Sequence, residues 1–193
     1  QLEHLVEHQQ GLVLFSGATG SGKTTSLYSL LNYCSTELGR HVISLEDPVE
    51  SNQLQLLQIQ VNERAGVTYA SGLKAILRHS PDIIMIGEIR DHETAKIAVE
   101  AALTGHLVLS TVHAKDSVNC LYRLLDLGVS IEELRQTALG IISQTLVTTV
   151  EDERKAIFEI LSDQILEQAI AAVTSNAVYK LPFTMTLAGQ KQQ

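Results

Sequence analysis

The feature that most constrains this 193-residue chain is a glycine-rich segment between two apolar runs. The segment reads Gly17-Ala18-Thr19-Gly20-Ser21-Gly22-Lys23-Thr24, which matches the pattern G-x-x-x-x-G-K-[ST]. Glycines adopt backbone angles closed to other residues, so successive N–H groups can turn inward around an anion. Residues 12–16 before the segment are typical of a buried strand, and residues 24–36 after it carry apolar side chains at helical spacing. A strand, this loop and a helix N-terminus, in that order, predict a site for phosphate groups.

The same loop supplies the candidate nucleotide-binding residues. Lys23 is placed to reach the β- and γ-phosphates of ATP, and the Thr24 hydroxyl is placed to ligate Mg²⁺. The full candidate set is Gly17, Ala18, Thr19, Gly20, Ser21, Gly22, Lys23, Thr24 and Thr25. The alternative is a plain glycine turn, which the flanking strand and helix disfavour.

Strand-like and helix-like runs alternate along the chain, which predicts an α/β fold with a twisted, mostly parallel sheet and helices on both faces. We expect further strands at 41–45, 83–86 and 107–112, and either an edge strand or an irregular segment at 54–61. Helices are expected at 68–79, 91–103, 116–127, 130–143 and 163–173, with a short β pair at 146–150 and 156–161 and a frayed end at 188–193. Residues 1–144 are expected to form the core, and residues 145–193 a small C-terminal annex.

Acidic residues follow two of the predicted strands. Glu88 comes directly after the apolar run 83–86 and Gly87, where a carboxylate can polarise an attacking water. Many P-loop ATPases have an aspartate at the position of Gly87, so Mg²⁺ binding would depend on Thr24, the phosphates and acids acting partly through water. Glu88 and Glu46 are the candidate acids. Glu46 opens the segment 46–50 (EDPVE), for which a solvated acidic loop is the alternative.

Two histidines flank the predicted strand 107–112. His106 precedes the strand and His113 follows it, so a straight strand separates them by roughly 20 Å and they cannot contact the same group. His113 is the better candidate for sensing the γ-phosphate, because it lies at the carboxyl end of the strand. For His106 a core or helix-capping role is the alternative.

Composition excludes several other functions. A formal charge of −8 disfavours a broad electrostatic contact with nucleic acid. No apolar run approaches the roughly 18 residues that span a bilayer, and the first residues do not have the pattern of a secretion signal. Cys34 and Cys120 are far apart in sequence, so a zinc site is not expected and two buried free thiols are.

Four segments together resemble the ATPases of type II secretion, type IV pili and competence pili. Residues 17–25, 46–50, 87–91 (GEIRD) and 105–113 (GHLVLSTVH) look like the Walker A, Asp box, Walker B and His box of that family. The resemblance implies a RecA-like hexamer at the cytoplasmic face of the membrane, where ATP turnover moves subunits against a membrane platform protein.

The resemblance also implies roles for individual residues. Glu50 would be the general base, and Glu88 would hold or activate the catalytic water with Mg²⁺. His106 and His113 would report the nucleotide state. Arg78 and Arg90 match arginines near the family's active site or subunit interface.

Within this family the chain is most similar to the competence-pilus ATPases of Gram-positive bacteria (ComGA-type). The similarity lies in residues 113–117, 123–129 and 156–161. Pilus-retraction and type II secretion ATPases are the alternatives, and Cys120 alone cannot build the four-cysteine zinc module of many extension members. The family's N-terminal domain is expected to be absent from this chain, with residues 1–10 as its connector.

Three other classes remain as alternatives. A P-loop small-molecule kinase would need an arginine-rich lid, which the sequence lacks. A DNA motor of the same fold is disfavoured by the negative charge and the few aromatic residues. A nucleotide-gated scaffold that does not hydrolyse ATP would make Glu88 dispensable.

Overall fold

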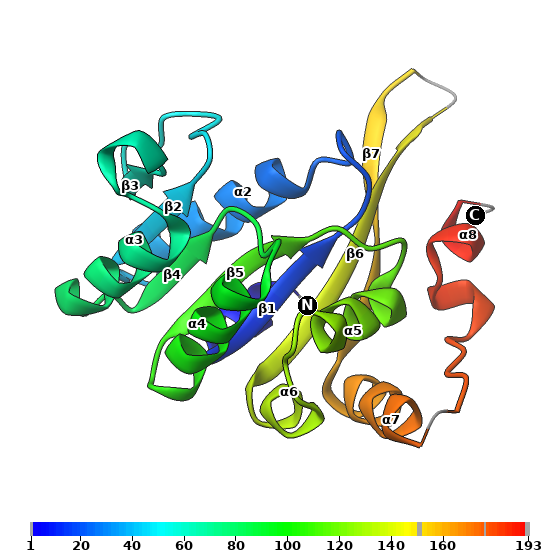
Figure 1. Cartoon of the computed structure of the whole chain (residues 1–193). Coiled ribbons are helices and arrows are strands. Elements are labelled where there is room, and N and C mark those ends of the chain that lie inside the picture. The colour runs from blue at the N-terminus through cyan, green and yellow to red at the C-terminus, as the bar shows by residue number, and fades with distance from the viewer. Residues whose placement is uncertain (1, 150–151, 176, 192–193) are drawn as a thin grey trace.

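The computed structural model describes residues 2–149, 152–175 and 177–191. In this part of the chain one seven-stranded sheet has the order β3-β2-β4-β5-β1-β6-β7 (Figure 1). The strands are β1 (Gly11–Ser16), β2 (Val42–Glu46), β3 (Leu57–Gln60), β4 (Ile83–Ile86), β5 (Leu107–Val112), β6 (Ala138–Thr148) and β7 (Arg154–Ser162). Neighbouring strands are parallel, except that β7 runs antiparallel to β6. The predicted α/β class with a mostly parallel sheet is confirmed.

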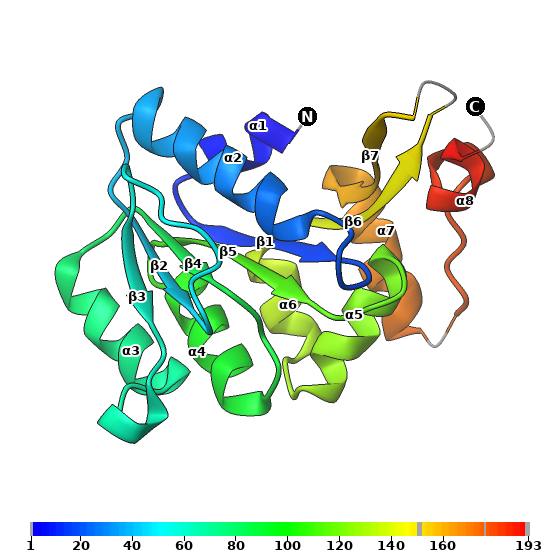
Figure 2. The same ribbon diagram turned by 90° about the horizontal axis from the view of Figure 1, so that it is seen from above.

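Helices cover both faces of the sheet, as predicted (Figure 2). Helices α1 (Leu2–Glu7) and α2 (Lys23–Thr36) pack on one face. The opposite face carries α3 (Tyr69–Ile76), α4 (His92–Leu103), α5 (Ser117–Asp126), α6 (Ile131–Thr137) and α7 (Asp163–Thr174). The short helix α8 (Leu187–Gln190) is fastened to β7 by a hydrogen bond from Gln190 Nε2 to the carbonyl of Phe158 at 2.6 Å.

The central strand β1 shows why both faces need cover. All six of its residues are buried. Leu12 and Leu14 pack under the α3–α7 layer, whereas Val13 and Phe15 pack under α1 and α2. Successive side chains of a strand point to opposite faces, so a continuous apolar run is typical of a strand between two helical layers.

The helix predicted over 130–143 is the main error of the sequence analysis. Its start is right, because Ser130 and Glu133 form the expected capping box. The helix ends at Thr137, however, and Ala138 begins β6, which pairs with β1 and β7. Gly140 and the β-branched pair Ile141-Ile142 are poor helix formers, and the two neighbouring strands supply the backbone hydrogen bonds that a helix would have made.

In the C-terminal part the two strands are longer than predicted, and part of the final segment is helical. The predicted β pair exists, but β6 spans residues 144 and 145, so the expected division between core and annex falls inside a strand of the common sheet. Positions 150 and 151 of the predicted pair and its turn lie outside the described residues. The expectation of a frayed end is wrong for 188–190, which belong to α8, and residues 192 and 193 lie outside the described part.

The remaining elements confirm the sequence predictions closely. Segment 54–61 contains the edge strand β3, and helix 68–79 is α3 continued by a 3-10 turn over Leu77–His79. Asp91 caps α4 by accepting a hydrogen bond from the backbone N–H of Thr94. Because β1, β5, β4 and β2 are parallel neighbours, their carboxyl ends lie at one edge of the sheet. Ligands of parallel α/β folds bind at this edge.

Candidate active site

The glycine-rich loop connects β1 to α2 at this edge of the sheet. Gly17, Gly20 and Gly22 have positive φ angles of 138°, 77° and 85°, a region that residues with a Cβ rarely adopt. At Gly22 a Cβ would also lie 2.8 Å from Gln144 Nε2, and at Gly17 it would lie 2.4 Å from the Gln144 carbonyl oxygen. The loop thus lies directly on β6. At Gly17 the Gln144 backbone leaves no room for a Cβ, and at Gly22 the positive φ angle is what favours glycine.

Lys23 begins α2 and is largely buried beneath the loop. Its Nζ donates hydrogen bonds to the carbonyls of Gly17 and Ala18, both at 2.9 Å. Burial lowers the pKa of the Lys23 ammonium, and the carboxylates of Glu88 and Glu50 oppose that shift. The charge of Lys23 is therefore fixed inside the loop, in an environment that favours a further anion.

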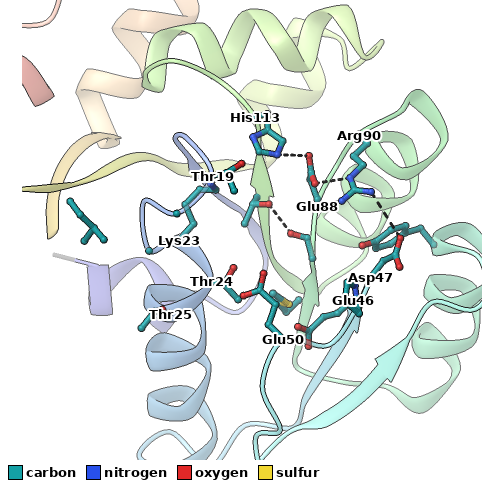
Figure 3. A pocket seen from close by; sticks show the side chains of 18 residues that line it. Thr19, Lys23, Thr24, Thr25, Glu46, Asp47, Glu50, Glu88, Arg90 and His113 are labelled. Carbon is teal, nitrogen blue, oxygen red and sulfur yellow. Dashed lines mark hydrogen bonds and ion pairs between the residues drawn. The ribbon is translucent and has the colours of Figure 1, made fainter. Parts of the chain in front are cut away.

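A cavity of about 550 Å³ lies between the loop and the strand ends (Figure 3). This volume is within the range of small-molecule and cofactor sites. The cavity is lined by Thr19, Gly20, Gly22, Lys23, Thr24, Thr25, Glu46, Asp47, Pro48, Glu50, Tyr69, Met85, Gly87, Glu88, Arg90, Thr111, His113 and Leu146. Most residues of the predicted site are thus brought together around one space, and they come from four separate strand ends.

Glu88 lies between two basic side chains. Its carboxylate contacts Arg90 Nε at 2.6 Å and His113 Nε2 at 3.2 Å, as the dashed lines in Figure 3 show. Arg90 also approaches Asp47, with 4.0 Å between Nη1 and Oδ2. The hydrogen bond to Glu88 raises the pKa of the Arg90 guanidinium. The Glu88 side chain is only 13% exposed, so these contacts hold a charged carboxylate at the cavity wall.

Hydroxyl groups on β5 fix the backbone that carries Glu88. Ser110 Oγ donates to the carbonyl of Ile86 at 2.8 Å, and Thr111 Oγ1 donates to the carbonyl of Gly87 at 2.7 Å. A Cβ at Gly87 would lie 3.1 Å from the Tyr69 hydroxyl and 3.3 Å from the Glu46 Cα. Gly87 is therefore suited to a close approach between β4, β2 and α3, where an aspartate would be crowded.

Glu46 is buried in a hydrogen-bonded cluster and is 2% exposed. Its carboxylate accepts hydrogen bonds from the hydroxyl of Tyr28, from Ser44 Oγ at 2.5 Å and from Gln58 Nε2 at 3.0 Å. Burial and the Glu46 carboxylate together raise the pKa of Tyr28 above its usual range. Both carboxylate oxygens of Glu46 thus have donors, and the residue also lines the cavity.

Outside the glycine-rich loop, two of the predicted site residues do not line the cavity. His106 precedes β5 at the opposite edge of the sheet, where its Nδ1 lies 3.2 Å from the carbonyl of Ala101, near the end of α4. Arg78 is exposed in the 3-10 turn after α3. The capping alternative for His106 agrees with this geometry, and neither residue is among those that line the cavity of its own chain.

Several residues of the site were missed in the sequence analysis. Tyr69, Thr111 and Leu146 line the cavity, and Gln144 donates to the carbonyl of Ser21 at 2.9 Å from below the loop. Thr111 lies near the carboxyl end of the predicted strand 107–112, which His113 follows. Its place at this strand end could have indicated that it lines the cavity. Gln144 and Leu146 had no such signal, because their strand was not predicted to lie beside β1.

Comparison with known proteins identifies the family. A model of the type II/IV secretion system protein family matches residues 1–182. The chain belongs to this family. The Bacillus subtilis competence protein ComGA is 45% identical to this chain over 188 residues, covering 89% of this chain and 53% of ComGA. The type II secretion system protein HxcR of Pseudomonas aeruginosa is 51% identical over 146 residues, covering 76% of this chain and 31% of HxcR.

Solved structures of secretion and pilus ATPases support the same assignment. The pilus retraction motor PilT, solved with ADP bound, superposes with a TM-score of 0.78 at 32% identity, covering 91% of this chain and 55% of PilT. The RecA-like fold expected from the family resemblance is confirmed. The chain spans about half the length of the curated competence proteins that it matches.

Two further observations concern membranes and metals. In residues 2–149, 152–175 and 177–191, every helix is too short or too polar to cross a membrane. In the same residues there is no group of three or more His, Cys, Asp or Glu side chains arranged to hold a metal ion. Cys34 and Cys120 are both buried free thiols, as expected.

Proposed function

We propose that this chain is the ATPase core of a motor that assembles a competence or type IV-like pilus for DNA uptake. The motor would convert ATP and water to ADP and phosphate and couple that reaction to mechanical work. One observation carries the proposal: a single cavity joins a complete phosphate-binding loop to the carboxylates of Glu50 and Glu88. The similarity to ComGA over most of the chain supports the competence role.

The binding step rests on the loop and on Lys23. Backbone N–H groups of residues 17–25 and the N-terminus of α2 would hold the phosphates. Lys23 is held at the loop by the carbonyls of Gly17 and Ala18, so its ammonium needs little reorganisation when phosphates bind. Preformed charge of this kind stabilises the developing negative charge of phosphoryl transfer.

The hydrolytic step rests on the two acids. Glu50 is the general base that takes a proton from the attacking water. Glu88 orients that water, and its own position is fixed by Arg90 and His113. His113 would respond to the γ-phosphate, because any group that moves this histidine also changes its contact with Glu88.

The residues around the cavity fit Mg²⁺, a hard cation that prefers oxygen ligands and keeps several waters. Thr24 offers a hydroxyl, and Glu88 offers a carboxylate that would act through water. When bound, Mg²⁺ would neutralise charge on the β- and γ-phosphates. Glu46 also lines the cavity and would act through water, while Tyr28, Ser44 and Gln58 hold its carboxylate in place.

The motor is a homo-oligomer, with a hexamer as the expected form. Arg78 and His106 lie away from the cavity of their own chain and would act at the interface between subunits. The site of action is the cytoplasmic face of the membrane, where the hexamer would contact a platform protein of the pilus machine. Direct binding of nucleic acid is not expected, in line with the charge of −8.

Two related functions and two of other classes compete with this proposal. Pilus retraction is favoured by the structural similarity to PilT, and type II secretion by the similarity to HxcR. A small-molecule kinase would transfer the phosphoryl group to an acceptor other than water. A nucleotide-gated scaffold would bind ATP without turnover.

The first test is ATP hydrolysis by the full-length protein with Mg²⁺, as a function of protein concentration. Lys23→Ala is the blank, and Lys180→Ala is a matched control at an exposed lysine. We expect turnover that depends on Lys23, rises more steeply than concentration, and falls by roughly 100-fold or more in Glu50→Gln. Nucleotide binding without turnover would favour the scaffold, and loss of Lys23-dependent binding would refute the proposal.

The competence role has its own test. The full-length gene is expected to restore DNA uptake to Bacillus subtilis cells that lack ComGA, and the Lys23→Ala variant is not. Restored ATP turnover without restored uptake would contradict the competence assignment and favour retraction or secretion.

A further inference from the structure

The loop that carries Glu50 is fastened to helix α2. This loop joins β2 to β3 over residues 47–56. Asn32 Nδ2 donates to Gln53 Oε1 at 2.9 Å, and Ser35 Oγ donates to the carbonyl of Gln55 at 3.0 Å. Because α2 begins at Lys23, one helix holds both the phosphate-binding loop and the segment that follows Glu50.

The opposite side of the loop is held by two side chains of the edge strand β3. Gln60 Oε1 accepts a hydrogen bond from the backbone N–H of Val49 at 3.3 Å, and Gln58 makes the larger set of contacts. Its Oε1 accepts a hydrogen bond from the backbone N–H of Gln53 at 2.7 Å. Its Nε2 donates to the carbonyl of Ser51 at 3.1 Å and to Glu46 Oε1 at 3.0 Å. A single amide therefore fixes two backbone positions within three residues of Glu50.

The third contact of Gln58 connects the loop to a rigid base. Glu46 is buried at the end of β2 and is held by Ser44 and Tyr28 as well as by Gln58. The amide at position 58 donates to this carboxylate and to the Ser51 carbonyl with its two N–H groups, and its oxygen accepts from a backbone N–H. A glutamate there would lack both donors and would place a second negative charge beside Glu46.

Glu50 itself is exposed on the loop, so its position depends on how the backbone around it is held. A general base must lie within hydrogen-bonding reach of the water it deprotonates. Misplacement by about 1 Å can lower a rate by about 100-fold. We propose that Gln58 is a positioning residue for ATP hydrolysis, which holds the Glu50 loop against Glu46 and α2. This inference rests on the proposed function, because it takes Glu50 as the base.

The first measurement needs no catalysis. In the full-length protein without nucleotide, hydrogen exchange of the segment 49–53 is compared between wild type, Gln58→Glu and Gln55→Glu. The control makes the same charge change at an exposed position of the same loop. We expect faster exchange only in Gln58→Glu, because its side chain can no longer donate to the Ser51 carbonyl or to Glu46, and repulsion from Glu46 displaces the oxygen that accepts from the Gln53 N–H. Unchanged exchange, or equal acceleration in the control, would overturn the inference.

The second measurement separates positioning from binding and from stability. We expect Gln58→Glu to lower kcat by about 10- to 100-fold while KM for ATP stays unchanged, since Lys23 and the phosphate loop are untouched. Gln58→Ala, which removes the amide without adding charge, should lower kcat in the same direction and serves if Gln58→Glu does not fold. A rise in KM alone, or a lower melting temperature with unchanged kcat, would overturn the proposal.

A double-mutant comparison decides whether Gln58 acts through Glu50. In a Glu50→Gln background the base is already lost, so Gln58→Glu should cause little further loss of turnover. Equal fold losses in both backgrounds would overturn the inference. The proposed function would instead be refuted if the wild type turned over ATP no faster than Lys23→Ala. If turnover depends on Lys23 but is unchanged in Gln58→Glu, only the role of Gln58 is refuted.

Discussion

The hydrogen bond between Tyr28 and Glu46 gives the sharpest stability prediction. Tyr28 is 7% exposed on α2, and Glu46 is 2% exposed at the end of β2. Tyr28→Phe removes one hydroxyl and leaves the ring, so the change creates almost no cavity. Its main effect is to deprive Glu46 Oε2 of its donor, because Ser44 and Gln58 both donate to Oε1.

A hydrogen bond to a charged group contributes about 1.5–3 kcal/mol. We therefore expect Tyr28→Phe to lower the free energy of unfolding by about 2 kcal/mol at pH 7. For a protein of this size each kcal/mol lowers the melting temperature by about 2–4 °C, so a fall of roughly 4–8 °C is expected. The measurements are urea unfolding at 25 °C and a thermal melt.

The dependence on pH follows from the raised pKa of Tyr28. The unfolded tyrosine loses its proton near pH 10, whereas the folded one keeps it to higher pH. The stabilisation is thus fully present below about pH 10 and is lost as pH rises toward the folded pKa. The difference between wild type and Tyr28→Phe should shrink accordingly in alkaline solution.

The matched control is Tyr122→Phe, at a residue that is 40% exposed on α5. We expect this control to change stability by less than about 0.5 kcal/mol, as surface substitutions usually do. In a Glu46→Gln background, Tyr28→Phe should cost less, because the acceptor is neutral. A loss in Tyr28→Phe no larger than in the control would refute the reasoning that Glu46 is a buried, charged acceptor.

Two further predictions concern the loop and a helix start. Gly22→Ala places a Cβ 2.8 Å from Gln144 Nε2 at a φ of 85°. Backbone strain of this kind costs roughly 1–3 kcal/mol, so the affinity for a fluorescent ATP analogue should fall by about 5- to 150-fold. An unchanged affinity would show that the loop tolerates a side chain. Glu133→Ala removes the capping box and the 3.0 Å ion pair with Lys96, and should lower the free energy of unfolding by about 1 kcal/mol at pH 7. Hydrogen bonds from Ser130 lower the pKa of Glu133 to about 2, so the stabilisation by Glu133 is present above about pH 4.5 and is lost as pH falls toward 2. The control is Glu132→Ala, at an exposed position of the same helix. If Glu133→Ala lowered the free energy of unfolding equally at every pH in acid unfolding, this assignment would be contradicted.

Local sequence signals predicted the site residues best where a residue's chemical role is tied to a short motif or to the end of a strand. The pattern G-x-x-x-x-G-K-[ST] between a strand and a helix predicts the loop residues, including Lys23 and Thr24, because this arrangement rarely serves anything but phosphate binding. Glu88, Glu50 and His113 were predictable because each follows a strand, and parallel strands end at a common edge. The capping residues Asp91 and Ser130 were equally visible, since a cap is a contact within one turn of helix.

Pairings between distant segments were not predictable in the same way. The segment 138–148 follows a genuine helix start, and nothing within it announces that β1 and β7 will flank it. The hydrogen-bond partners of Glu46 were not predictable either, because Tyr28 and Gln58 lie 18 and 12 residues away in sequence. A carboxylate in an acidic loop looks solvated until the partners that bury it are known.

By itself the sequence determined the α/β class, the phosphate-binding loop and the family, because each depends on residue types at short, fixed spacings. The tertiary structure decided which acids face the cavity, which one is buried, and that His106 and Arg78 lie away from it. It also decided that helix α6 ends at Thr137 and is followed by strand β6, on which the phosphate-binding loop lies. The physical reason is that burial and hydrogen-bond partners come from segments far apart in the chain, whose free energies are set only when the whole sheet is assembled.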